Sequence, residues 1–242
     1  MRRFFLPSPP DGNIITVTGS DAEHIGYSLR MKTGDALTFT HCGTDYSCVI
    51  TSITKDTVCC EVKDISPTSS EPDIELTIFQ AYPKGDKLEL IIQKTAELGV
   101  CRIVPFLSSR CVARPDRAAF EKKRTRLMKI SEEAAKQSGR GIIPTVEPLH
   151  SFSEAVKALS ECDIPLICYE NGGIPLKETL YSSNGKRRIG VMIGSEGGFT
   201  SDEVRQASEA GASTIWLGER ILRCETCPIA VTAIIMSLTG NM

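Results

Sequence analysis

The spacing of apolar positions changes once along the chain. Up to about residue 64, short runs alternate apolar and polar residues between turn-forming residues, which predicts strands. These strands are expected at 13–18, 36–40, 46–53 and 57–62. One short helix is expected after Ser20, because Ile25 and Leu29 stand four residues apart. Several short strands at this spacing predict a small barrel.

The segment 65–73 follows neither period. It contains two prolines, three serines and a threonine, which favour turns over helix or strand. We therefore predict a domain boundary here, with a small domain and its linker at 1–73 and a larger domain at 74–242.

From residue 74 onward, strands and helices alternate. Strands are expected at 74–79, 102–105, 164–169, 189–193 and 214–217, and the longer helices at 87–98, 116–138 and 225–238. Capping-box patterns mark three helix starts, at Asp86/Glu89, Ser151/Glu154 and Thr200/Glu203. Such alternation predicts an α/β domain, a mostly parallel sheet with helices on both faces.

In open sheets of this kind, ligands bind beyond the carboxyl ends of the strands. That rule selects the loops after Tyr169, Ile193 and Leu217. The loop 194–200 has three glycines, so backbone amides can approach a ligand closely. It lacks the P-loop and dinucleotide-binding patterns, and Glu196 favours a cationic or neutral ligand over a phosphate. The alternative interpretation is a tight turn without a ligand.

The loop after Leu217 contains two arginines. Arg220 and Arg223 can clamp a phosphate or carboxylate, or they can be surface residues paired with Glu219 and Glu225. Spacing alone favours, by a small margin, surface residues paired with these glutamates.

Cysteine and histidine chemistry is less favoured. Cys224 and Cys227 form a Cys-x-x-Cys at a helix start, where a lowered thiol pKa would permit a redox role. A second pair of ligands for zinc is missing nearby, so no metal is predicted. His24, His41 and His150 are isolated from any nucleophile pattern, which disfavours a Ser-His-Asp or Cys-His enzyme.

Composition narrows the class of protein. Hydrophobic residues make up 41% and charged residues 24% of the 242, as in ordinary globular proteins. The apolar run near the start is too short for a secretion signal, and no run approaches the ~18 residues of a membrane span. Ten cysteines without a secretion signal are expected to be reduced thiols. We therefore expect a cytoplasmic protein that does not enter a membrane.

Charge is unevenly distributed, although the formal net charge is only −2. Residues 110–140 contain ten Lys/Arg against four Asp/Glu, whereas 141–242 contain eight against twelve. The basic block is either a footprint for a polyanion or a solvated helix face.

Several motifs resemble one known family. IGSEGGFTSDEV (193–204) is similar to IGPEGGFSxxE, and LGERILRCET (217–226) is similar to LGxRILRxET. KGDKLELIIQKTAELGV (84–100), AAKQSGR (134–140), MRRFF and LRMKTGD (29–35) resemble further blocks. Together they resemble the ribosomal RNA small-subunit methyltransferase E family of the SPOUT class, whose usual proline is replaced here by Ser195.

The resemblance implies a fold and an activity. It implies a PUA-like β-barrel domain followed by a SPOUT domain with a C-terminal trefoil knot, in a homodimer. The implied activity is S-adenosylmethionine-dependent methylation of N3 of a uridine in 16S ribosomal RNA, free or in the small ribosomal subunit. The sulfonium cation of that cofactor suits a glutamate-bearing glycine loop.

The resemblance also implies site residues. Cofactor contacts are expected from Tyr169, Glu170, Ile193, Gly194, Gly197, Gly198, Leu217, Gly218, Ile221, Leu222 and Thr226. For loss of the N3 proton, either Glu196 or Glu225 is the base, or Arg220 or Arg223 stabilises the uracil anion. RNA contacts are expected from Arg2, Arg3, Arg30 and Lys32 in the small domain, and from Arg110 and Arg140 because they belong to the basic block. The rival hypotheses are a non-catalytic RNA-binding or ribosome-assembly factor and a thiol redox protein.

Overall fold

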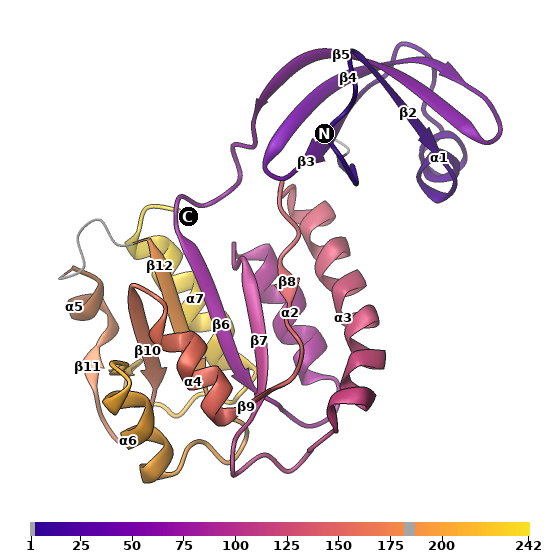
Figure 1. Ribbon diagram of the computed structural model, residues 1–242. Coiled ribbons are helices and arrows are strands. Elements are labelled where there is room, and N and C mark those ends of the chain that lie inside the picture. Colours follow the sequence, from indigo (N-terminus) through magenta and orange to yellow (C-terminus); the bar gives the residue numbers. More distant parts are fainter. Residues whose placement is uncertain (1–2, 182–186) are drawn as a thin grey trace. The chain divides into compact units, whose positions relative to one another are not determined.

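The chain folds into two compact units (Figure 1). The computed structural model describes residues 3–181 and 187–242. One unit comprises Met1–Glu71 and Lys136–Ile142, and the other comprises Pro72–Ala135 and Ile143–Met242. The sequence prediction had a single division after residue 73. It did not separate the segment Lys136–Ile142, because the helical pattern of 116–138 runs into that segment without interruption.

The first unit is built on one five-stranded sheet. Its strands are β1 (Arg3–Phe5), β2 (Ile14–Thr18), β3 (Ala36–His41), β4 (Thr44–Ile53) and β5 (Thr57–Pro67), in the order β1-β3-β4-β5-β2. Helix α1 (Ser20–Glu23) continues into a π-helix, η1 (His24–Ser28). The predicted small barrel is present only as a half-barrel, because β1 and β2 remain its edges among the described residues. Strand β1 is short and pairs in parallel with β3.

Strand β5 continues into the segment that we predicted to be irregular. Tyr46 pairs with Ile65, and Thr44 pairs with Pro67, so the ladder with β4 extends beyond residue 62. The cross-strand partner therefore overrides the weak local β propensity of a serine- and proline-rich segment.

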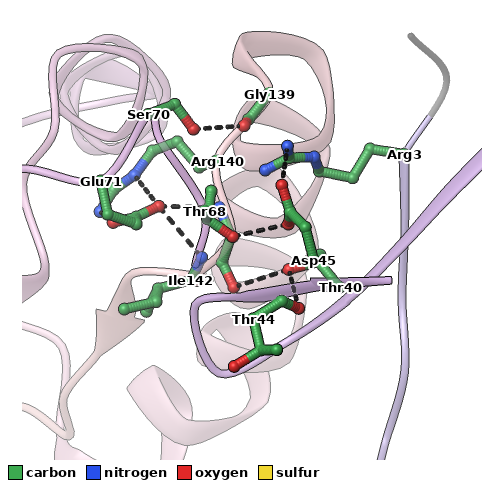
Figure 2. A network of polar contacts seen from close by, with 11 residues as sticks. Arg3, Thr40, Thr44, Asp45, Thr68, Ser70, Glu71, Gly139, Arg140 and Ile142 are labelled. Carbon is green, nitrogen blue, oxygen red and sulfur yellow. Dashed lines mark hydrogen bonds and ion pairs between the residues drawn. The ribbon is translucent and has the colours of Figure 1, made fainter. Parts of the chain in front are cut away.

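A buried polar network connects the segment Lys136–Ile142 to the rest of the first unit (Figure 2). The Arg140 side chain is 3% exposed, and its Nη2 donates to Glu71 Oε2 at 2.6 Å. Glu71 Oε1 also accepts hydrogen bonds from the backbone N–H groups of Gly141 (2.8 Å) and Ile142 (3.1 Å). One carboxylate thus fixes both the guanidinium and the backbone of the segment that follows α3.

Asp45 forms the other half of this network. It accepts hydrogen bonds from Thr68 Oγ1 at 2.6 Å and from Arg3 Nη2 at 2.6 Å (Figure 2). Arg3 and Asp45 are both mostly buried, with side chains 14% and 12% exposed. The charged groups of Arg3 and Arg140 are therefore engaged inside the first unit.

The second unit is an α/β domain with a parallel sheet, as predicted from the alternation. The strand order is β11-β13-β10-β12-β6-β7-β8, every pairing is parallel, and β9 also pairs with β7. The strands are β6 (Glu75–Ala81), β7 (Arg102–Leu107), β8 (Thr145–Val146), β9 (His150–Ser151), β10 (Ile164–Cys168), β11 (Ile174–Pro175), β12 (Arg188–Ile193) and β13 (Ser213–Trp216).

Helices cover both faces of this sheet. They are α2 (Lys87–Glu97), α3 (Arg117–Ser138), α4 (Phe152–Ser160), α5 (Leu176–Tyr181), α6 (Ser201–Glu209) and α7 (Thr226–Leu238). Helix α4 contacts β7, β10 and β12, whereas α7 contacts β6 and packs against α2 (Figure 1). None of the helices in the described part of the chain is long and apolar enough to cross a membrane.

The helix starts follow two of the three predicted capping boxes. Ser151 with Glu154 and Thr200 with Glu203 each form both reciprocal hydrogen bonds. The capping box at Asp86 is wrong, because its side chain forms no capping hydrogen bond. Asp86 has φ −95° and ψ 10°, whereas a capping side chain needs an extended backbone at that position.

Candidate active site

The carboxyl ends of β10, β12 and β13 surround a cavity of about 480 Å³. All three loops that the sequence analysis selected contribute to its wall, as expected for ligand sites of open parallel sheets. The predicted residues that line it are Tyr169, Glu170, Ile193, Gly194, Glu196, Gly197, Gly198, Leu217, Gly218, Arg220, Ile221, Leu222, Arg223 and Glu225. Thr226 does not line it, because it is an exposed residue in the first turn of α7.

The glycine loop after β12 is tightly folded. The N–H of Gly198 donates to Ser195 O at 2.9 Å, and a Cβ at Gly194 would lie 2.9 Å from the Gly198 Cα. Gly198 has φ +64°, and a Cβ there would lie 2.8 Å from Glu170 Oε1. Phe199, only 2% exposed, stacks on Phe106 and anchors the end of the loop in the core. A side chain at Gly194 would collide with the backbone of Gly198, and one at Gly198 would collide with the carboxylate of Glu170.

Lys87 joins two of the cavity loops. It is the first residue of α2, and its Nζ lies 3.0 Å from Glu196 Oε1 in the glycine loop and 3.2 Å from Glu225 Oε2 in the loop before α7. Glu196 Oε1 also accepts the backbone N–H of Lys84 at 3.1 Å. The side chains of Lys87, Glu196 and Glu225 are 33%, 26% and 17% exposed. One ammonium therefore serves two carboxylates.

The three charges shift one another's pKa values. Burial raises the pKa of Glu196 and of Glu225, but hydrogen bonds from their own backbone N–H groups and from Lys87 outweigh it, so both pKa values are lowered. The hydrogen bonds to Glu196 and then Glu225 raise the pKa of Lys87, against burial. Both candidate bases are therefore ionised, and both are weaker bases than an ordinary carboxylate.

The cysteine arrangement contradicts the redox hypothesis. Burial and a hydrogen bond to Glu225 raise the pKa of Cys224 to about 12, where the hypothesis requires a lowered one. Cys168, another thiol of the cavity wall, has its pKa raised by a hydrogen bond with Cys227 and by burial. Cys168 and Cys224 therefore stay protonated at neutral pH and pack as small apolar groups.

Arg220 and Arg223 both line the cavity and are exposed. Within residues 3–181 and 187–242, neither forms an ion pair, and Glu225 pairs with Lys87 instead. The interpretation of these arginines as surface residues neutralised by Glu219 and Glu225 is therefore wrong. Their guanidinium groups are available to a ligand.

Two family models match the chain. One, described as an RNA methyltransferase domain, matches residues 70–236, and the other, described as an RNA methyltransferase PUA domain, matches residues 17–63. A relative from Bacillus subtilis, named ribosomal RNA small subunit methyltransferase E, is 36% identical over 97% of this chain and 96% of its own. The chain belongs to the ribosomal RNA small subunit methyltransferase E family. The resemblance noted in the motifs is thus confirmed.

Other members of the ribosomal RNA small subunit methyltransferase E family also match this chain over nearly its full length. The crystal structure of the enzyme from Neisseria gonorrhoeae, bound to S-adenosyl methionine, is 32% identical with a TM-score of 0.87 and covers 98% of each chain. A relative from Aquifex aeolicus is 26% identical over 93% of this chain and 95% of its own. The similarity therefore extends over both units.

The residues expected to contact RNA differ in how far they are exposed. Arg30, in a left-handed conformation at φ +52°, and Lys32 are exposed in the first unit. Arg3 and Arg140 are instead held in the buried network, so neither is presented to a phosphate at the surface. Arg110 lies against the glycine loop, where its Nη1 donates to Gly197 O at 2.9 Å. Arg2 lies outside the described residues.

The basic block also exposes less free positive charge than the sequence count indicates. Four of its arginines form ion pairs, namely Arg117 with Glu154, Arg124 with Glu121, Arg126 with Glu89 and Arg140 with Glu71. Three of these four acidic partners lie outside 110–140, so their charge was missing from the local sum.

Sequence reasoning missed part of the cavity wall. The further lining residues are Lys87, Cys168, Ser195, Phe199, Ile215, Trp216, Glu219, Cys224 and Cys227. Lys87 could have been predicted from the sequence, because α2 follows the carboxyl end of β6. That end lies at the same edge of the sheet as the carboxyl ends of the three selected strands.

Proposed function

We propose that this protein transfers a methyl group from S-adenosylmethionine to N3 of a uridine in 16S ribosomal RNA. The observation that carries the proposal is the single cavity in which the glycine loop after β12 meets the arginine-bearing loop after β13. Its volume, about 480 Å³, lies within the range of small-molecule sites. Membership of the family and the cofactor-bound relative from N. gonorrhoeae support the choice of donor and RNA.

The residues present fit this cofactor. The glycine loop leaves a cradle that a Cβ at Gly194 or Gly198 would fill, so backbone groups can contact a ligand directly. We propose that Ile193, Gly218 and Leu222, with the two glycines, hold the adenosine and methionine parts. The ionised carboxylates of Glu196 and Glu225 complement a cation rather than a phosphate. When bound, the cofactor supplies an electrophilic methyl group on a sulfonium.

The chain's own residues must deal with the N3 proton of uridine. A carboxylate with a lowered pKa accepts a weakly acidic proton poorly, which disfavours Glu196 and Glu225 as the base. Arg220 and Arg223 lack ion-pair partners among the described residues and line the cavity. We propose that they donate hydrogen bonds to the uracil oxygens and stabilise the anion that remains when N3 loses its proton to solvent.

Arg30 and Lys32 are the proposed phosphate contacts of the first unit, together with Arg110 beside the cavity. Contacts to phosphates set affinity rather than sequence preference. Arg30→Ala should weaken RNA binding to all sequences and reduce the slope of log K against log salt by about 1. An unchanged slope removes Arg30 from the phosphate contacts.

We also propose the finer structural properties that the family resemblance implies, a C-terminal trefoil knot and a homodimer acting in the cytoplasm. Ile221, which lines the cavity, is an 81% exposed large apolar side chain, and this supports a partner surface at the site. Light scattering coupled to gel filtration tests the dimer, and a monomeric mass contradicts it.

Calorimetric titration with S-adenosylmethionine tests the function. We expect saturable binding with one cofactor per chain, lost on replacement of Gly198 by a bulky residue. Absence of binding would instead support a non-catalytic RNA-binding or assembly factor on the same fold.

A further inference from the structure

Lys87 is the only ammonium that lines the cavity among the described residues, and it is placed between two acidic side chains from different loops. Its Nζ lies 3.0 Å from Glu196 and 3.2 Å from Glu225, and it also reaches Cys224 Sγ at 3.7 Å. Lys87 is the first residue of α2, and the next residue, Leu88, is fully buried and anchors the start of this helix in the core. The ammonium is therefore supplied by a helix and contacts side chains of two different loops.

Without this ammonium, the two carboxylates would repel each other. Both are partly buried, and like charges held close together in such a place raise each other's pKa. Glu196 would keep the backbone N–H of Lys84, and Glu225 would keep the thiol of Cys224. Neither of these neutral donors compensates a negative charge as an ammonium does.

We propose that Lys87 is a positioning residue, which fixes the carboxylates of Glu196 and Glu225 and so joins the two loops that form the cofactor cavity. One ammonium against two carboxylates leaves this cluster with a net charge of −1. That charge complements a cofactor with a single net positive charge, such as S-adenosylmethionine. The inference deepens the proposed function and rests on it for the identity of the ligand.

Other charged and titratable groups also face the cavity, and the test has to separate them from Lys87. Besides the thiols, these are Tyr169, Glu170, Glu219, Arg220 and Arg223. On the far side of α2, Glu89 is paired with Arg126 of α3. Lys94 provides a matched control, since it lies on the same helix, is paired with Glu97 at 2.9 Å, and does not line the cavity.

The first experiment uses the protein without cofactor. Carboxyl carbons of ¹³C-labelled glutamate are followed by NMR during a pH titration, and Glu196→Gln and Glu225→Gln assign the two signals. We expect both midpoints to move to higher pH in Lys87→Met and to stay in place in Lys94→Met. Unchanged midpoints in Lys87→Met would overturn the inference.

The second experiment measures S-adenosylmethionine affinity by calorimetry between pH 5.5 and 8.5. Because protonation of the glutamates removes the charge that complements the cofactor, Lys87→Met should bind more weakly than wild type by a factor that grows as pH falls. A rise of one unit in a glutamate pKa that starts below 4.5 lowers the ionised fraction of that glutamate by at most about twofold at pH 5.5. Lys87→Arg should restore most of the binding, because it returns a cation to the same place.

Two outcomes contradict a positioning role. One is a loss of affinity in Lys87→Met that is equal at every pH and is not restored by Lys87→Arg, which indicates a general structural defect. The other is an equal loss in Lys94→Met. If the wild-type protein itself does not bind the cofactor, the proposed function fails, while the NMR titration still decides the role of Lys87.

Discussion

The pair of Glu71 and Arg140 offers a sharp test of the first unit's stability. Replacing Glu71 with alanine removes four hydrogen bonds at once, two from the Arg140 guanidinium and two from the backbone N–H groups of Gly141 and Ile142. Arg140, 3% exposed, would then be a buried cation without its carboxylate. Breaking a buried ion pair by removing one partner costs about 3–5 kcal/mol. We expect the upper half of that range, because the two N–H groups also lose their acceptor.

Replacing the other partner, Arg140, should lower the stability of the first unit less. In Arg140→Met, Glu71 keeps both backbone N–H donors and an apolar side chain fills the buried space, so we expect about 1–3 kcal/mol. The double variant should be less destabilised than the sum of the two single variants, since they share one interaction. Arg205→Met, which removes exposed pairs on α6, should change stability by less than about 0.5 kcal/mol.

Native-state amide exchange followed by mass spectrometry suits this test, because it reports each unit separately. The single tryptophan, Trp216, lies in the second unit and does not follow unfolding of the first. Peptides from β3, β4 and β5 should lose protection in Glu71→Ala, and peptides from β10 and β12 serve as the internal reference. Protection of β3–β5 that stays within about 1 kcal/mol of wild type would refute the reasoning.

Three further predictions follow from individual side chains. Gly198→Ala, at φ +64° and facing Glu170 Oε1, should lower stability by about 1–2 kcal/mol and weaken cofactor binding, measured by urea unfolding and calorimetry. Cys224, with its pKa raised to about 12, should react with iodoacetamide at pH 7.5 far more slowly than exposed Cys42, and equal rates by peptide mass spectrometry would contradict its burial. The backbone N–H of Ser151 and then Arg117 lower the pKa of Glu154 from 4.5 to about 2, so its contribution to α4 is present above pH 4.5 and is lost as pH falls towards 2. Glu154→Gln should flatten that acid-induced loss of amide protection in α4.

The spacing of apolar residues predicted most of the fold, because most segments follow either the strand period or the helix period. The strands β10 and β12 are continuous apolar runs buried on both faces, and they appear within a residue or two of the expected positions. The short strands β8, β9 and β11, of two residues each, carry no period and were missed. Their pairing is decided by neighbours distant in sequence, which local patterns do not contain.

The loops of the site were predictable for a geometric reason. Carboxyl ends of parallel strands meet at one edge, so the residues after β10, β12 and β13 had to converge. Which side chains pair within that edge was not predictable. From the sequence of the loop 218–226 alone, Glu225 is expected to pair with an arginine of the same loop. In the structure it pairs instead with Lys87, which lies 138 residues earlier in the chain.

Charge counting failed in a similar way. Arg140 was expected at a phosphate because it belongs to a basic block, yet its partner Glu71 lies far upstream in the other half of a discontinuous unit. Only the folded chain brings the two together. Local net charge therefore overstates the surface available to RNA whenever the acidic partners come from elsewhere in the sequence.

The most direct measurement of the central claim is nucleoside mass spectrometry of small ribosomal subunits and of free 16S RNA after incubation with the purified protein and S-adenosylmethionine. We expect one added methyl group per RNA molecule, recovered as 3-methyluridine, in at least one of the two substrates. A methyl group on another atom or base, or no methyl transfer to either substrate by protein that binds the cofactor, would contradict it.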